Sequence, residues 1–141
     1  MFALFFERQH HVLLVRFSDR LARDDLARLD RDARAFVAEY GVSRGIVDFT
    51  AVEVVEIETA EFVRRGQQAA IMTGQDRVYV MPRPDLFGLG RMFSTYQKIG
   101  GNREPLIVRT LDEAYGALEL VDPQFEPLPL APRASNGQAQ A

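Results

Sequence analysis

Four glutamates follow a short apolar segment in the middle of the chain. They are Glu53, Glu56, Glu58 and Glu61. A carboxylate pair can act as acid and base only in a cleft that raises one pKa, which a sequence pattern does not reveal. Two interpretations remain open: the carboxylates meet a basic partner or mimic a permanently phosphorylated state, or they suit the positive end of a helix dipole and face solvent. We favour the second interpretation.

Other residues that could do chemistry lack the spacing that chemistry needs. His10 and His11 are adjacent, so on a strand they point to opposite faces and make poor joint ligands for one metal. The glycines of Gly88-Leu89-Gly90 are not followed by Lys-Ser/Thr and do not directly follow a strand, so they do not form a phosphate loop. No nucleophile elbow is present. The sequence therefore predicts no metal, no cofactor and no enzymatic activity.

A wide aromatic face on one expected helix is the second candidate site. This face consists of Phe87, Phe93 and Tyr96, with Met92 beside them. The simpler interpretation is that they fill the core. The alternative is that Phe87, Phe93 and Tyr96 line a pocket for an apolar or amphipathic ligand, or form a dimer surface. In that case two neighbouring arginines, Arg83 and Arg91, could hold an anionic group.

Composition limits the class of protein. The chain has 141 residues, of which 47% are hydrophobic and 26% charged, and this balance is typical of a globular domain. Its formal net charge of −3 argues against a nucleic-acid partner. Cysteine is absent, which fits a reducing compartment, and no apolar run is long enough to span a membrane. We therefore expect a cytoplasmic protein.

Short apolar segments that alternate with amphipathic ones predict the elements that would position these residues. Strands are expected over residues 2–6, 11–17, 44–49, 77–82 and 105–109. Helices are expected over 23–40 and 58–67, from Pro84 to Gly100, and after a capping box at Thr110–Glu113. Ser18 and Asp19 should end the second strand, and an acidic turn and loop should follow Phe49.

The order of these elements is β-β-α-β-α-β-α-β-α, about five strands and four helices. Strands that alternate with helices predict an α/β fold with a mixed, mostly parallel sheet and an antiparallel edge. We expect residues 1–121 to form a single domain. Residues 122–141, rich in proline and small residues, should form an extended and then largely disordered tail.

Two blocks, together with the element order, resemble the SpoIIAA-like branch of the STAS domains, the fold of anti-sigma-factor antagonists. Val47–Val52 is similar to the Asp-Leu-Ser-x-Val turn of that family. The second block runs from Arg77–Val80 through Leu86–Phe93 and is joined by Leu111–Ala114 near the end. The resemblance covers about residues 5–121. It implies a STAS-like fold and a regulatory role.

The family's phosphorylation switch has no acceptor in this chain. Where the antagonists continue with Ile-Asp-Ser-Ser-Gly, Ile57 stands at the modified serine, with Glu56 before it and Glu58 and Thr59 after it. Isoleucine has no hydroxyl group, so phosphorylation cannot occur at that position.

We therefore expect a non-enzymatic, STAS-like regulatory or protein-interaction domain that forms a homodimer. Its partner would be a protein, such as a component of sigma-factor regulation or a kinase-like protein. The partner surface is predicted at six residues: Asp48, Thr50, Glu53, Glu56, Glu58 and Thr59. The alternative, by analogy with Sec14-type lipid-binding domains, is a carrier or sensor for a small apolar or amphipathic ligand.

Overall fold

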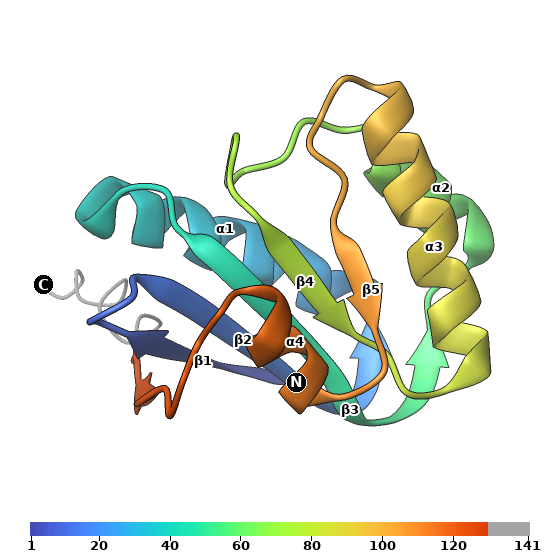
Figure 1. The fold of residues 1–141 in the computed structure, drawn as a ribbon. Coiled ribbons are helices and arrows are strands. Elements are labelled where there is room, and N and C mark those ends of the chain that lie inside the picture. The colour runs from blue at the N-terminus through green and yellow to red at the C-terminus, as the bar shows by residue number, and fades with distance from the viewer. Residues whose placement is uncertain (130–141) are drawn as a thin grey trace, which may run out of the picture.

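The computed structural model describes residues 1–129 and shows an α/β protein (Figure 1). Within these residues the chain forms six strands and four helices. In chain order they are β1 (Phe2–Glu7), β2 (Val12–Ala22), α1 (Arg23–Tyr40), β3 (Arg44–Glu56), α2 (Thr59–Gly66), β4 (Arg77–Val80), α3 (Pro84–Ile99), β5 (Leu106–Val108), α4 (Leu111–Ala117) and β6 (Glu126–Pro127). The predicted order of the first nine elements is confirmed.

All six strands belong to one mixed sheet in the order β5-β4-β3-β2-β1-β6. The strands β2, β3, β4 and β5 are parallel to one another, whereas β1 is antiparallel to both β2 and β6. The prediction of a mixed sheet is confirmed, but the further prediction that it is mostly parallel is not. The sixth strand was not predicted, because a two-residue strand that contains Pro127 has no sequence pattern of its own.

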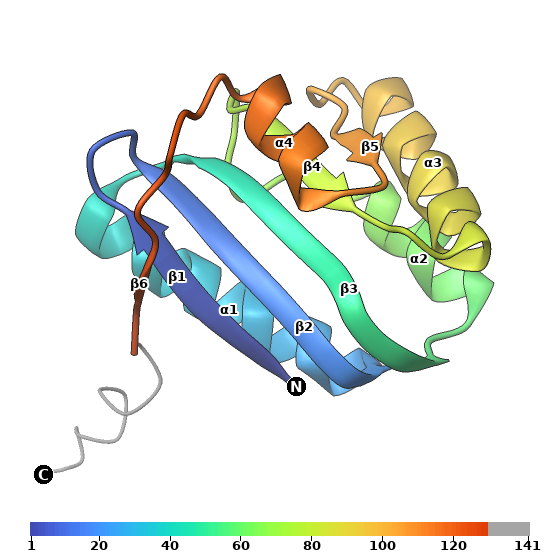
Figure 2. The same ribbon diagram turned by 60° about the horizontal axis from the view of Figure 1, so that its bottom comes forward.

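The helices divide the core between the two faces of the sheet. α1, α2 and α3 contribute Leu29, Phe62 and Leu86 to the larger hydrophobic cluster on one face. α4 is the one helix that the described residues place on the other face, where Ala114 and Leu118 pack against the strands (Figure 2). The first face is therefore the thicker layer, and the space between its helices determines whether a ligand can enter.

Helix α1 begins and ends where its apolar periodicity predicts. The Asp25 carboxylate accepts a hydrogen bond from the backbone N–H of Ala22, 2.9 Å away, and so caps the first turn. Gly41 follows the last turn with φ of +85°, a conformation that favours glycine.

Strands β2 and β3 extend beyond their predicted ends, and the expected acidic turn and loop after Phe49 are wrong. β3 continues to Glu56 and pairs with Ser18–Ala22, which were expected to lie outside β2. Val52 and Val55 pack into the core from this extension, and its glutamates are exposed. Two β-bulges interrupt the pairing. They disrupt the alternation of apolar and polar residues, so the sequence pattern does not predict a strand there.

The end of the described chain packs back onto the sheet. Gln124 donates its backbone N–H to the buried Glu7 carboxylate over 2.9 Å, and Leu128 donates its own to Leu4. These contacts lie in the segment expected to be an extended tail after residue 121. The expected disorder after residue 129 lies outside the described residues.

Candidate ligand-binding site

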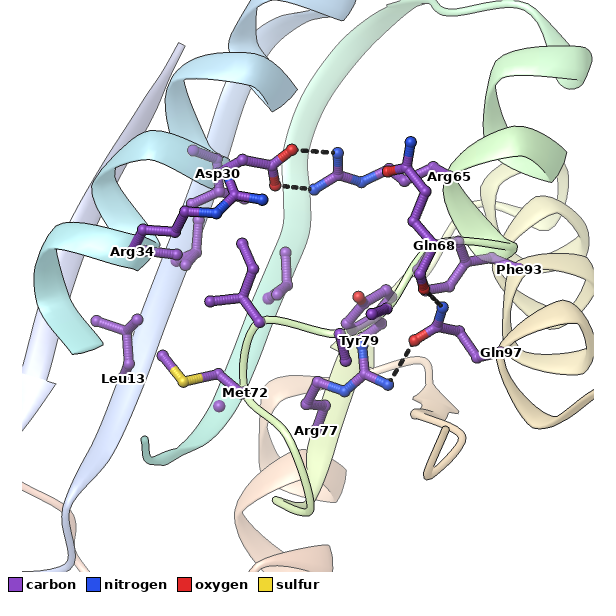
Figure 3. Close-up of a pocket in the computed structure, with 18 of the residues that line it drawn as sticks. Leu13, Asp30, Arg34, Arg65, Gln68, Met72, Arg77, Tyr79, Phe93 and Gln97 are labelled. Atoms are coloured by element: carbon purple, nitrogen blue, oxygen red, sulfur yellow. Dashed lines mark hydrogen bonds and ion pairs between the residues drawn. The ribbon is translucent and has the colours of Figure 1, made fainter. Parts of the chain in front are cut away.

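A cavity of about 130 Å³ lies above the sheet (Figure 3). Helix α1 forms one wall, and helix α3 forms another together with the segment that follows α2. Its floor consists of two rows of residues that run across β2, β3 and β4. The first row is Leu13, Gly45 and Arg77, and the second is Val15, Val47 and Tyr79. All six face the side of the sheet that α1 covers.

Missing side-chain volume creates this cavity. Gly45 carries no side chain at the centre of the first row, where a strand residue would normally fill the space above the sheet. Small residues also form parts of the walls, with Ala33 on α1 and Ala69 and Ala70 after α2. The space above β3 therefore stays empty although the helices on both sides pack against the sheet.

A second apolar cavity of about 40 Å³ continues from the first. The two share five lining residues, which are Leu29, Val47, Arg65, Tyr79 and Phe93. Phe17, Phe49 and Met81 line the second cavity and lie next along β2, β3 and β4. The first cavity thus leads along the strands toward a region lined almost entirely by apolar side chains.

An ion pair crosses the top of the cavity. Both terminal nitrogens of Arg65 on α2 donate to the two Asp30 oxygens on α1, over 2.9 and 2.5 Å (Figure 3). Burial of the guanidinium lowers the pKa of Arg65, but the hydrogen bonds and charge of Asp30 outweigh this effect and hold the pKa above its ordinary value. The pair joins the two helices that form opposite walls.

Gln97 fixes the wall formed by α3 and the segment after α2. It is 1% exposed, and its amide nitrogen donates to the Gly66 and Gln68 carbonyls over 2.7 and 2.8 Å. Its amide oxygen accepts a hydrogen bond of 2.8 Å from Arg77 (Figure 3). A single side chain thereby positions the loop and orients an arginine at the cavity.

Arg34 is the remaining charged residue in the lining. It follows Asp30 by one turn on α1 and is exposed. Within residues 1–129 it has neither a hydrogen bond nor an ion pair. The lining contains three arginines, Arg34, Arg65 and Arg77, and one carboxylate, Asp30, so it has an excess of two positive charges.

The predicted pocket residues are dispersed in the structure. Phe93 lines both cavities and stacks on Tyr79 with ring centres 5.6 Å apart. Arg83 instead donates to the Val52 and Glu53 carbonyls and pairs with Asp85. Of these residues, only Phe93 belongs to the cavity.

The remaining three predicted pocket residues lie elsewhere on α3. Phe87 lies under the Arg109 guanidinium, whose carbon is 4.1 Å from the ring centre. Tyr96 packs against Gly66 of α2, and Arg91 is exposed. The sequence offered one signal for the site that was missed: Gln97 is a polar residue on the same apolar face as Phe93.

The predicted partner surface is mostly exposed, but Asp48 is not part of it. Asp48 is 4% exposed, accepts hydrogen bonds from the Thr50 backbone N–H and hydroxyl, and pairs with Arg16 over 3.5 Å. Five members are exposed along the end of β3 and the start of α2: Thr50, Glu53, Glu56, Glu58 and Thr59. Asp48 serves to hold the bulge in β3.

The described residues contain neither a metal-binding cluster nor a membrane-spanning helix. No three His, Asp or Glu side chains within residues 1–129 are grouped so that they could hold a metal ion. No helix in that part of the chain has the length and apolar character needed to cross a membrane. A scan against protein-family models finds no match, and neither does a search of curated proteins.

Proposed function

We propose that this protein is a non-enzymatic, STAS-like domain that binds a small amphipathic molecule in the cavity above Gly45 and acts as a sensor or carrier of it. The observation that carries this proposal is the cavity of about 130 Å³, whose lining combines apolar side chains with three arginines and one aspartate. An engineered apolar cavity of about 150 Å³ in another protein binds benzene, so this space is large enough for an apolar group of about six carbon atoms.

The arrangement of elements supports the STAS-like part of the proposal. α1, α2 and α3 each connect neighbouring parallel strands, so β2 to β5 follow one another in both sequence and space. This arrangement agrees with the element order that suggested the family. A regulatory role follows from the same resemblance, with ligand occupancy in place of serine phosphorylation.

Filling the cavity from its floor is the direct test. A β-carbon added at Gly45 would meet only the Leu13 carbonyl oxygen, at 3.7 Å, so Gly45→Val is compatible with the strand. We expect the wild-type protein to bind 1-hexanol in isothermal titration calorimetry and the Gly45→Val variant to bind it at least about tenfold more weakly, because the new side chain occupies the space of the ligand.

Gly88→Ala serves as the matched control. Gly88 lies on α3 away from the cavity, and no atom lies within 4 Å of an added β-carbon. This variant should bind 1-hexanol as the wild type does. No binding to the wild type, or equal binding to Gly45→Val, would contradict the proposal.

A second candidate function is a protein interaction at the end of β3. The pairing between β3 and β4 ends at Asp48, so the β3 extension has β2 on one side and no strand on the other within residues 1–129. Val54 is 49% exposed there, beside Glu53 and Glu56. A basic, partly apolar partner would match this surface.

Charge reversal tests this second function. We expect Glu56→Lys/Glu58→Lys to abolish the capture of a partner from cell extract while the circular dichroism spectrum stays unchanged, because both side chains are exposed. Capture of every partner by the double variant would exclude this surface.

A further inference from the structure

We propose that the ligand is a monocarboxylate with an apolar body of about six carbon atoms, bound with its carboxylate at Arg34 in the first cavity. This inference rests on the proposed ligand-binding function and adds the chemical class and the orientation of the ligand. It is carried by the distribution of charge along the two neighbouring cavities, which share five lining residues.

Polarity changes in one direction along the floor. The row formed by Leu13, Gly45 and Arg77 includes a charged side chain, and the next row, Val15, Val47 and Tyr79, has only a tyrosine hydroxyl. The lining then continues to Phe17, Phe49 and Met81, which have no charge. A molecule that matches this gradient has one charged end and one apolar end.

The wall formed by α1 repeats the same gradient. Leu26 lines only the second cavity and Leu29 lines both. Asp30, Ala33 and Arg34 line only the first. The helix therefore places its charged residues opposite the charged row of the sheet, and its leucines opposite the aromatic residues of the deeper cavity.

The charge of the ligand follows from which arginines are already neutralised. Asp30 pairs with Arg65 through two hydrogen bonds, so that guanidinium is occupied. Arg77 donates to the Gln97 amide and the Arg103 carbonyl, neither of which carries charge. Arg34 has no partner among residues 1–129. Two arginines that line the first cavity therefore have no carboxylate partner among the described residues, and their charge favours an anion.

A carboxylate fits this end of the cavity because a guanidinium presents paired N–H groups that match its two oxygens. The Asp30–Arg65 pair shows the same match at the cavity itself. Tyr79 lines the space between the charged end and the deeper cavity, and its hydroxyl has no hydrogen bond among the described residues. It is available to donate to the ligand or to a bound water molecule.

The test compares hexanoate with the neutral molecules hexanamide and 1-hexanol by isothermal titration calorimetry. We expect hexanoate to bind the wild type about tenfold more tightly than either, since hydrogen bonds to a charged group are stronger than neutral ones. Arg34→Gln should remove most of that preference for hexanoate over the two neutral molecules, with thermal unfolding as a check on the fold.

Arg31→Gln is the matched control for the loss of a positive charge. Arg31 lies on α1, is exposed, and does not line the cavity. The preference for hexanoate should persist in this variant. A preference that survives in Arg34→Gln, or that Arg31→Gln lowers equally, would overturn the role of Arg34.

The remaining outcomes separate this inference from the proposed function. If 1-hexanol and hexanoate bind the wild type equally well, the cavity binds ligands but the anionic class is wrong. If hexyl phosphate binds more tightly than hexanoate, the cavity prefers a phosphate group and the assignment of a carboxylate is wrong. If none of these molecules binds, both the inference and the proposed function fail.

Discussion

Glu7 is 1% exposed at the turn between β1 and β2, where its carboxylate joins two distant segments. One oxygen accepts the His10 backbone N–H at 2.7 Å and the other accepts that of Gln124 at 2.9 Å. The hydrogen bond from Gln124 lowers the pKa of Glu7, burial raises it, and the bonds from His10 lower it further, so the net direction is downward. The ionised form is therefore stabilised by folding.

This gives a pH dependence with a definite sign. Because the pKa of Glu7 is lower in the folded protein, its contribution to stability is complete above the ordinary glutamate pKa of about 4.3 and is lost as the pH falls below that value. We expect Glu7→Gln to lower the free energy of unfolding at pH 7 by about 1–3 kcal/mol.

Urea unfolding of both proteins between pH 7 and pH 3 measures this effect. The difference between wild type and variant should shrink as the pH falls below about 4.3, because the wild-type carboxylate becomes protonated. Asp25, Glu61 and Asp85 also have lowered pKa values, but they are common to both proteins. A difference that is constant with pH would show that Glu7 does not act through its charge.

The Asp30–Arg65 pair carries a second prediction at the residue scale. The two side chains are 25% and 23% exposed, so water screens them less than a surface pair. A double-mutant cycle of Asp30→Ala and Arg65→Ala should give a coupling energy of about 1–2 kcal/mol. The exposed Asp24–Arg28 pair, at 3.6 Å, should give less. Equal coupling energies in the two cycles would contradict the structural role assigned to the pair.

Helices α2 and α3 lie close together at Gly66. A β-carbon added there would lie 2.9 Å from the β-carbon of Tyr96 and 3.2 Å from the carbonyl oxygen of Phe93, so the backbone of α3 would have to move. We expect Gly66→Ala to lower the free energy of unfolding by about 1–3 kcal/mol. It should also weaken ligand binding, since Gln97 holds the Gly66 carbonyl beside the cavity.

Gly88→Ala on α3 provides the comparison for this prediction. Gly88 faces open space, whereas a β-carbon added at Gly90 on the same helix would lie 2.4 Å from the sulfur of Met81. Gly88→Ala should therefore stabilise the protein by about 0.5–1 kcal/mol through helix propensity. Chemical denaturation measures the free energy of unfolding of Gly66→Ala and Gly88→Ala. Similar changes in the two variants would contradict the close approach of α2 and α3.

Element-scale features differed in how well the sequence predicted them. α1 was predicted to the residue because its apolar positions recur with the helical period, and the Thr110–Glu113 capping box is present at the start of α4. The extension of β3 was missed because two bulges disrupt the two-residue alternation. The cavity was missed because it depends on small residues from separate parts of the chain: Gly45, Ala33, Ala69 and Ala70.

For the whole molecule, the mixed sheet assigns different roles to its two faces. α1, α2 and α3 enclose the cavity on one face, and α4 covers part of the other. The predicted homodimer stays a prediction. Sedimentation velocity should give a mass of about twice the 15.9 kDa of one chain, and a single-chain mass at all concentrations would contradict it.

Nuclear magnetic resonance of the ¹⁵N-labelled protein, titrated with hexanoate and separately with 1-hexanol, tests the central claim that the cavity above Gly45 binds a small amphipathic molecule. The largest chemical-shift changes should occur at the backbone amides of Gly45, Ala69 and Ala70, which line the cavity. These chemical-shift changes should be absent when the Gly45→Val variant is titrated. No changes with either molecule, or largest changes at Phe87 or around Thr50–Thr59, would contradict the account.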